Sequence, residues 1–156
     1  MSLSKVLHAA IDEVGYKEGA NNDNKFAKIA GHANNKPWCA TFIRTCFILG
    51  EEAKAIPDTA YCPFIESWAR EHNRIVPLAE AKKGDLALFD FTRSGKSEHV
   101  EILINDFNAT TPAIIRTIGG NTGGSKPNAD ANGDGVAKKI RSVSYIRVIV
   151  RPNWSK

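Results

Sequence analysis

Apolar residues recur at helical spacing through the first half of the chain. This periodicity predicts amphipathic helices over Ser4–Val14, Lys25–Ala30, Pro37–Leu49 and about Pro63–Glu71. The third of these helices has the widest apolar stripe, so we expect it to be central and largely buried. Proline suits the first turn of that helix, and Gly50 is a natural C-terminal stop.

After Gly84 the pattern changes to strands. Leu86–Phe91 and His99–Ile104 flank the turn-like segment Thr92–Lys96, which is typical of a hairpin. Further strands are expected over residues 113–118, 136–143 and 145–150. Helices followed by consecutive antiparallel strands predict an α+β fold, and without an internal repeat or a linker we expect one domain over residues 1–156.

Composition is that of an ordinary soluble domain. The 156 residues are 42% hydrophobic and 24% charged, and no apolar run approaches the roughly 18 residues of a membrane span. Residues 1–5 lack the features of a secretion signal. Lys and Arg number 21 against 17 acidic residues, and the net charge of +4 favours an anionic partner such as a bacterial wall polymer. No nucleic-acid-binding motif is visible, so we expect neither a nucleic acid nor a membrane as partner.

Cysteine is rare in this chain and therefore informative. The three cysteines are Cys39, Cys46 and Cys62, and an odd, small number argues against a disulfide framework. On one helix, the first two would lie about 10 Å apart, too far for a bridge. We therefore expect at least one free thiol, as in a reducing compartment. Cys46 is best explained as core, and Cys62, beside Pro63, as structural.

Cys39 is the candidate nucleophile because it falls in the first turn of the predicted central helix. Unpaired N–H groups and the helix dipole favour a thiolate there. No carboxylate stands between Asp23 and Glu51, a segment that contains four cationic residues. The alternative is a small buried hydrophobic residue, which most lone cysteines are.

A cysteine nucleophile needs a histidine base. His8 and His72 are expected to be solvated, and His32 lies in a loop of uncertain direction. His99 differs, because strand alternation directs it away from the Val100 face, toward a surface where the Cys39 helix could pack. A merely exposed strand histidine is the alternative.

Two residues are candidates for orienting the histidine. Asn121 follows a predicted strand, and its amide oxygen can accept a hydrogen bond from an imidazole N–H; its alternative is a turn residue. Glu101 shares the His99 face, but residues two apart on one strand lie about 7 Å apart. For Glu101 a solvated carboxylate is therefore the favoured interpretation.

With these residues in view, the chain resembles the CHAP family, the cysteine- and histidine-dependent amidohydrolases/peptidases of phage endolysins and bacterial wall hydrolases. The resemblance covers about residues 10 to 150. The matching segments, in chain order, are Gly15–Gly19, Pro37–Phe42, Lys83–Phe89, His99–Ile102, Gly120–Thr122 and Gly133–Lys139.

The resemblance implies a papain-like fold and hydrolysis of amide bonds in peptidoglycan. It makes Cys39 the nucleophile, His99 the base and Asn121 the orienting residue. Two departures stand out, because many relatives have a Glu where this chain has Gly119, and a small residue where it has Glu101. Glu101 as an auxiliary that supplies the missing carboxylate is therefore a further alternative.

A calcium loop is suggested and then disfavoured by the sequence. Asp130–Gly135 matches the start of such a loop, D-x-N-x-D-G. Its ninth and twelfth positions, however, are Lys138 and Arg141. We read residues 128–135 as a glycine-rich hairpin and expect no metal and no cofactor.

The leading hypothesis is a monomeric phage endolysin with peptidoglycan as its partner, an endopeptidase more readily than an N-acetylmuramoyl-L-alanine amidase. Such a lysin would stay in the host cytoplasm until a holin releases it to the wall. The alternatives are a secreted antibacterial wall hydrolase and a non-catalytic wall-binding module.

Overall fold

The computed structural model describes residues 2–122 and 133–155 of the chain. Its α-helices are α1 (Ser2–Asp12), α2 (Phe26–Ala30), α3 (Cys39–Leu49) and α4 (Cys62–Glu71). Single turns of 3₁₀ helix lie at Ala20–Asn22, Ala53–Ala55, Leu78–Glu80 and Val143–Tyr145. No helix in the described ranges is both long and apolar enough to cross a membrane.

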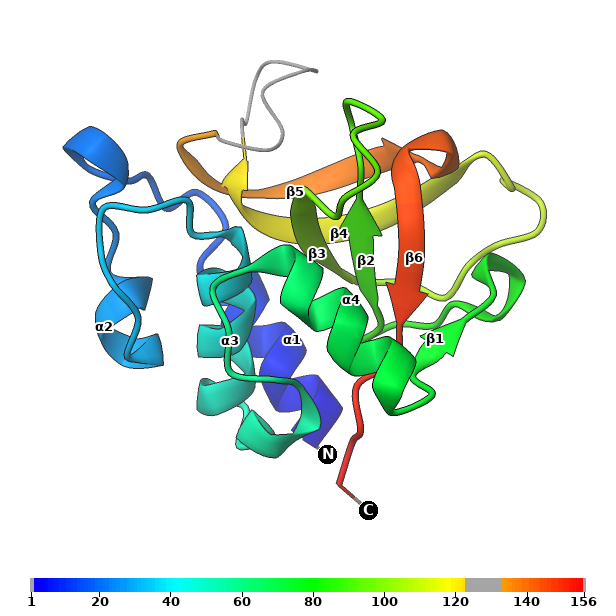
Figure 1. Ribbon diagram of the computed structural model, residues 1–156, viewed down its shortest axis with the longest axis horizontal. Helices are drawn as coiled ribbons and strands as arrows, with labels where there is room; N and C mark the ends of the chain where they lie inside the picture. The colour runs from blue at the N-terminus through cyan, green and yellow to red at the C-terminus, as the bar shows by residue number, and fades with distance from the viewer. Residues whose placement is uncertain (1, 123–132, 156) are drawn as a thin grey trace.

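The strands form a single antiparallel sheet. They are β1 (Ile75–Val76), β2 (Leu86–Phe89), β3 (His99–Leu103), β4 (Ile114–Thr122), β5 (Gly135–Ser142) and β6 (Ile146–Val150). Their order is β1-β6-β2-β3-β4-β5. The helices gather on one side of this sheet (Figure 1), so the predicted α+β arrangement of N-terminal helices packed on an antiparallel sheet is confirmed.

The hydrophobic core lies on both faces of the sheet. On one face, α3 packs Phe42 and Phe47, both fully buried, into a cluster that includes Val100 and Ile102 of β3. On the other face a smaller cluster includes Phe89 and Leu103. The helix predicted to be central is therefore central, and β3 carries buried side chains toward both clusters.

Helix α3 begins at Cys39, two positions later than the predicted start at Pro37. The reason is Trp38, whose backbone (φ −123°, ψ 20°) is not helical. Its indole is held by a hydrogen bond to the Glu18 carboxylate (2.8 Å) and a stacked contact with Phe26. Cys39 is thus the first residue of the helix.

Strand β4 is longer than predicted and includes Asn121 rather than ending before it. The pairing with β5 shifts register between Gly119 and Thr122, and Asn121 has a left-handed backbone (φ 54°) at that irregularity. The glycine-rich composition predicted a turn here; the chain instead continues as a bulged strand.

Candidate active site

Cys39 lies where three elements meet. It is 5% exposed, begins α3, and its sulfur interacts with the backbone N–H of Val100 at the start of β3. The first N–H groups of a helix have no partners within it, so the helix terminus supplies positive potential to this thiol. The predicted environment for a reactive cysteine is therefore present.

His99 begins β3 and is fully buried, so it is not the exposed strand histidine of the alternative. Its ring lies near those of Phe89 and Phe91, with centroids 6.1 and 5.9 Å away. The expectation that α3 would pack on the His99 face is wrong, because α3 covers the Val100 face. The two residues meet at the end of the strand instead, across the N-terminus of α3.

The thiol and the imidazole stabilise each other's charged forms. A hydrogen bond from Cys62 and the contact with His99 lower the pKa of Cys39, although burial opposes this. For His99, burial favours the neutral ring. The contact with Cys39 and the hydrogen bond and charge of Glu101 nevertheless raise its pKa to about 9. The arrangement favours a thiolate beside an imidazolium.

Glu101 holds the imidazole directly, with 2.8 Å between its Oε2 and Nε2 of His99. Both side chains are fully buried, so the interpretation of Glu101 as a solvated carboxylate is wrong. The spacing of about 7 Å applies to the backbone, and a long glutamate side chain leaning along its strand closes that gap.

The Glu101 carboxylate is completely enclosed by polar partners. Arg141 on β5 donates from Nε (2.9 Å) and Nη2 (2.5 Å), and the Thr117 hydroxyl on β4 donates to Oε1 (2.6 Å). Burial raises the pKa of Glu101, but these donors and His99 outweigh it and lower the pKa to about 2. The carboxylate is therefore charged at neutral pH.

Gly119 on β4 makes room for this carboxylate. A Cβ at that position would lie 2.5 Å from both Cγ and Oε2 of Glu101. The two positions at which the chain departs from the CHAP pattern therefore lie side by side, because the Glu101 side chain fills the space that a side chain at Gly119 would need. The alternative in which Glu101 supplies the carboxylate fits this geometry.

The hydrogen bond to Glu101 determines which nitrogen of the His99 imidazole can transfer a proton. A carboxylate only accepts, so Nε2 of His99 must carry a proton. Nδ1 is buried and makes no regular hydrogen bond among the described residues. It is therefore the nitrogen available to exchange a proton near Cys39.

Asn121 is fully buried in β4, and its backbone carbonyl oxygen accepts a hydrogen bond from the backbone N–H of Gly133 (2.6 Å). The described partner of His99 Nε2, which Asn121 was predicted to hold, is Glu101. The orienting role of Asn121 therefore stays a prediction.

Cys62, interpreted as structural from the sequence, lies in the site. It is the first residue of α4, and its Sγ is 3.5 Å from Sγ of Cys39. This contact with Cys39, together with burial, raises the pKa of Cys62 well above its usual value. Cys62 thus donates the hydrogen bond and Cys39 accepts it. All three cysteines are free, which agrees with the expectation of at least one free thiol.

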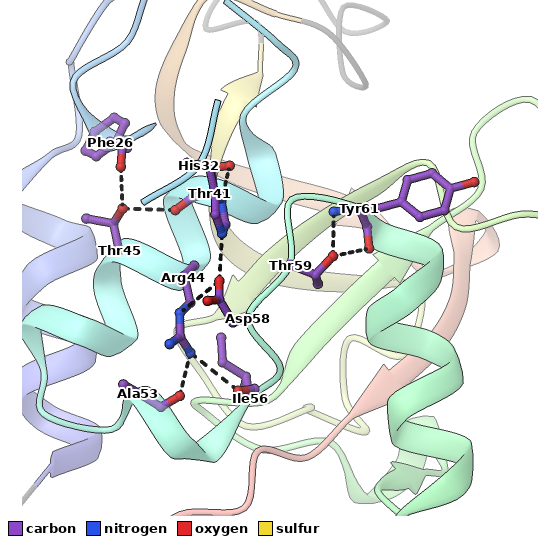
Figure 2. Close-up of polar contacts among 10 residues, drawn as sticks. All are labelled: Phe26, His32, Thr41, Arg44, Thr45, Ala53, Ile56, Asp58, Thr59 and Tyr61. Atoms are coloured by element: carbon purple, nitrogen blue, oxygen red, sulfur yellow. Dashed lines mark hydrogen bonds and ion pairs between the residues drawn. The ribbon is translucent and has the colours of Figure 1, made fainter. Parts of the chain in front are cut away.

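The loop before Cys62 is tied to α3 through His32 (Figure 2). Nδ1 of His32 lies 2.8 Å from Oγ1 of Thr41 on α3, and Nε2 lies 2.8 Å from Oδ1 of Asp58 in the loop. His32 thus links α3 to the loop before Cys62 and is not the base for Cys39.

Metal binding finds no support in the described residues, where no group of three His, Cys, Asp or Glu side chains could hold an ion. Asp130 and Asn132 of the calcium-like segment lie outside the described residues. Arg141, at the twelfth position of that pattern, pairs with Glu101.

Comparison with known proteins identifies the fold. No family model matches the chain, and no curated protein matches it. Solved structures do match. The peptidoglycan hydrolase RipB from Mycobacterium tuberculosis is 16% identical (TM-score 0.59), with 99% of this chain and 66% of that one covered. The P60 domain of a Mycobacterium avium subspecies paratuberculosis antigen is also 16% identical (TM-score 0.56; 99% and 96% covered).

An NLP/P60-family protein from Staphylococcus aureus, described as similar to lipoprotein, is 12% identical (TM-score 0.54), with 99% and 42% covered. The chain spans just under two thirds of RipB, the first of these structures. The CHAP resemblance itself stays a prediction, since these structures carry the P60 and NLP/P60 names. The chain therefore has the papain-like α+β fold of the NLP/P60 peptidoglycan hydrolase structures.

Proposed function

We propose that this domain hydrolyses amide bonds in bacterial peptidoglycan through a cysteine thiolate. One observation carries the proposal: Glu101 fixes Nε2 of His99, while Cys39 and His99 stabilise each other's charged forms. Thiol hydrolases need this spatial arrangement, in which an orienting acid contacts the base and the base lies beside the nucleophile. The fold shared with RipB, a peptidoglycan hydrolase, supports the choice of substrate.

In the acylation step, the Cys39 thiolate attacks the amide carbonyl carbon and forms a carbon–sulfur bond. The backbone N–H groups at the start of α3, that of Cys39 first, are placed to stabilise the oxyanion. Nδ1 of His99 then gives its proton to the leaving amine as the carbon–nitrogen bond breaks. The product is a thioester on Cys39 and a neutral imidazole.

In the deacylation step, the neutral Nδ1 of His99 takes a proton from water, and the resulting hydroxide attacks the thioester carbonyl. The carbon–sulfur bond breaks, the acid product loses its proton to solvent and leaves as a carboxylate, and the thiolate–imidazolium pair is restored. Glu101 stays ionised throughout and stabilises the imidazolium, a role that its low pKa suits.

Within this proposal, cleavage of a peptide bond in the stem or bridge peptides is favoured over cleavage of the amide that joins muramic acid to L-alanine. The phage-endolysin role and holin-mediated release stay predictions.

The bond cleaved is tested by digesting purified peptidoglycan and identifying the fragments by mass spectrometry. We expect new peptide amino termini within stem or bridge peptides and glycan strands that keep their L-alanine. Release of peptides beginning with L-alanine would make the domain an amidase instead. Walls that yield no fragment at any pH would contradict the proposal.

Activity should fall as the pH rises through about 9. His99 must be protonated to act as the acid, and its pKa is raised to about 9, so the protonated form is lost above that value. On the acid side, the lowered pKa of Cys39 extends the thiolate to lower pH than an ordinary thiol would allow. The measurement is kcat/KM on soluble wall fragments from pH 5 to 10.

The Glu101→Gln variant should move the alkaline limb of this profile to lower pH, because the carboxylate that stabilises the imidazolium is gone. Glu71→Gln, on the exposed end of α4, is the control and should leave the profile unchanged. An alkaline limb that stays at the same pH in Glu101→Gln would contradict the assignment of Glu101 as the orienting residue.

A further inference from the structure

The proposed hydrolysis uses one thiol, yet the site contains two. Sγ of Cys39 and Sγ of Cys62 lie 3.5 Å apart, and each cysteine is 5% exposed. Each is also the first residue of a helix, so the N-termini of α3 and α4 meet at this pair of sulfurs. Cys46, by contrast, is buried within α3, and its thiol has a raised pKa.

Contacts between α3 and the segment before Cys62 hold these two sulfurs close together. Arg44 on α3 donates from Nη1 to the carbonyl oxygens of Ala53 and Ile56, and its Nε lies 3.6 Å from the Asp58 carboxylate. Figure 2 shows these contacts beside the His32 link, all of them on the segment that leads into Cys62. The loop is therefore fastened to the helix that carries the nucleophile.

We propose that Cys62 is a resolving cysteine, which converts peroxide-oxidised Cys39 into a reversible Cys39–Cys62 disulfide. A thiolate at a helix N-terminus is the form that peroxides oxidise, and a second thiol in contact with it can capture the product. The disulfide would switch the enzyme off while sparing its nucleophile from permanent oxidation.

The reaction balances in two steps. The Cys39 thiolate attacks one oxygen of hydrogen peroxide, the O–O bond breaks, and sulfenic acid and hydroxide form. The Cys62 sulfur then attacks the sulfenic sulfur, a disulfide forms, and the oxygen leaves as water with the Cys62 proton. Overall, one thiolate and one thiol become a disulfide, and one peroxide becomes one water and one hydroxide.

Little movement is needed for the second step. A disulfide has an S–S distance of about 2.05 Å, so the sulfurs must approach by about 1.5 Å from their present separation. Once bonded, Cys39 can neither attack a carbonyl nor accept the hydrogen bond from Cys62. Reduction by a dithiol restores both groups.

The test treats the full chain with hydrogen peroxide, blocks free thiols, and maps the digest by mass spectrometry without reduction. We expect a cross-linked pair of peptides containing Cys39 and Cys62, and none containing Cys46. This readout does not depend on the proposed function. Conversion of Cys39 to sulfinic or sulfonic acid without the cross-link would overturn the inference.

The activity readout, which does rest on the proposed function, uses variants. Wild type should lose wall hydrolysis in peroxide and regain it in dithiothreitol. Cys62→Ser should lose hydrolysis and not regain it, because Cys39 proceeds to sulfinic acid. Cys46→Ala, the control, should behave as wild type. Recovery of Cys62→Ser equal to that of wild type would overturn the resolving role.

Discussion

Replacing Cys39 by alanine is expected to lower wall hydrolysis by a factor on the order of 10⁴ or more, because the sulfur that forms the thioester in the proposed mechanism is removed. In this variant the contribution of Cys39 to the raised pKa of Cys62 is gone, but burial still opposes ionisation of the Cys62 thiol. The measurement is the loss of turbidity of purified walls over time. Sedimentation of the protein with the same walls should be unchanged.

Cys46→Ala is the matched control for this experiment. It removes a thiol from the same helix, within the core, and should leave the rate of lysis near that of wild type. If Cys39→Ala lyses walls as well as wild type, Cys39 is not the nucleophile. If wild type binds walls without lysing them, the domain is the non-catalytic wall-binding module.

Removing the positive charge of Arg141 is expected to have the largest effect on stability. Arg141→Gln removes one of the two cationic partners of the buried Glu101 carboxylate and leaves His99 as the other, and breaking a buried pair on one side costs about 3 kcal/mol. The loss is measured as the free energy of unfolding in urea at pH 7. The same variant should also weaken the hold of Glu101 on His99.

Arg116→Gln is the control, because Arg116 lies exposed on β4 beside the same strand pair and should change stability by less than about 0.5 kcal/mol. In a Glu101→Gln background, Arg141→Gln should cost less, since no buried carboxylate is left uncompensated. If Arg141→Gln lowers the free energy of unfolding equally in wild type and in Glu101→Gln, the Arg141–Glu101 pair does not stabilise the fold.

The pH dependence of the free energy of unfolding follows from the pKa of Glu101. Its pKa is about 2 in the folded protein and 4.5 in its ordinary state, so the paired carboxylate stabilises the fold above pH 4.5. That contribution is lost as the pH falls from 4.5 through 2. The difference between wild type and Arg141→Gln should therefore shrink over this range.

The elements of the fold could be predicted because their periodicity is strong. The helix through Phe42 and Phe47 is apolar on a wide face, and the strand through His99 alternates clearly. The boundaries were less predictable, because tertiary contacts fix them. The start of α3 depends on how Glu18 holds Trp38, and the extent of β4 depends on its pairing with β5.

The residues of the candidate site could likewise be predicted only in part. Cys39 and His99 could be identified from a helix start, a strand position and the resemblance. Arg141 could not, because alternation favours its neighbour Ile140 for the interior, whereas Ile140 is 64% exposed and Arg141 is buried. The ion pair of Arg141 with the buried Glu101 carboxylate accounts for that reversal. Cys62 meets Cys39 through the packing of α4, for which a single sequence carries no local signal.

The pairing of Glu101 with Gly119 has an evolutionary consequence. Glu101 holds the imidazole from β3 and fills the space beside Gly119 on β4, so a larger residue at position 119 would require a smaller one at position 101. The two positions should therefore change together among homologues, with glutamate on one strand accompanied by glycine on the other. Searches that require the acid at the Gly119 position would overlook proteins built like this one, whereas a search for the reciprocal exchange would find them.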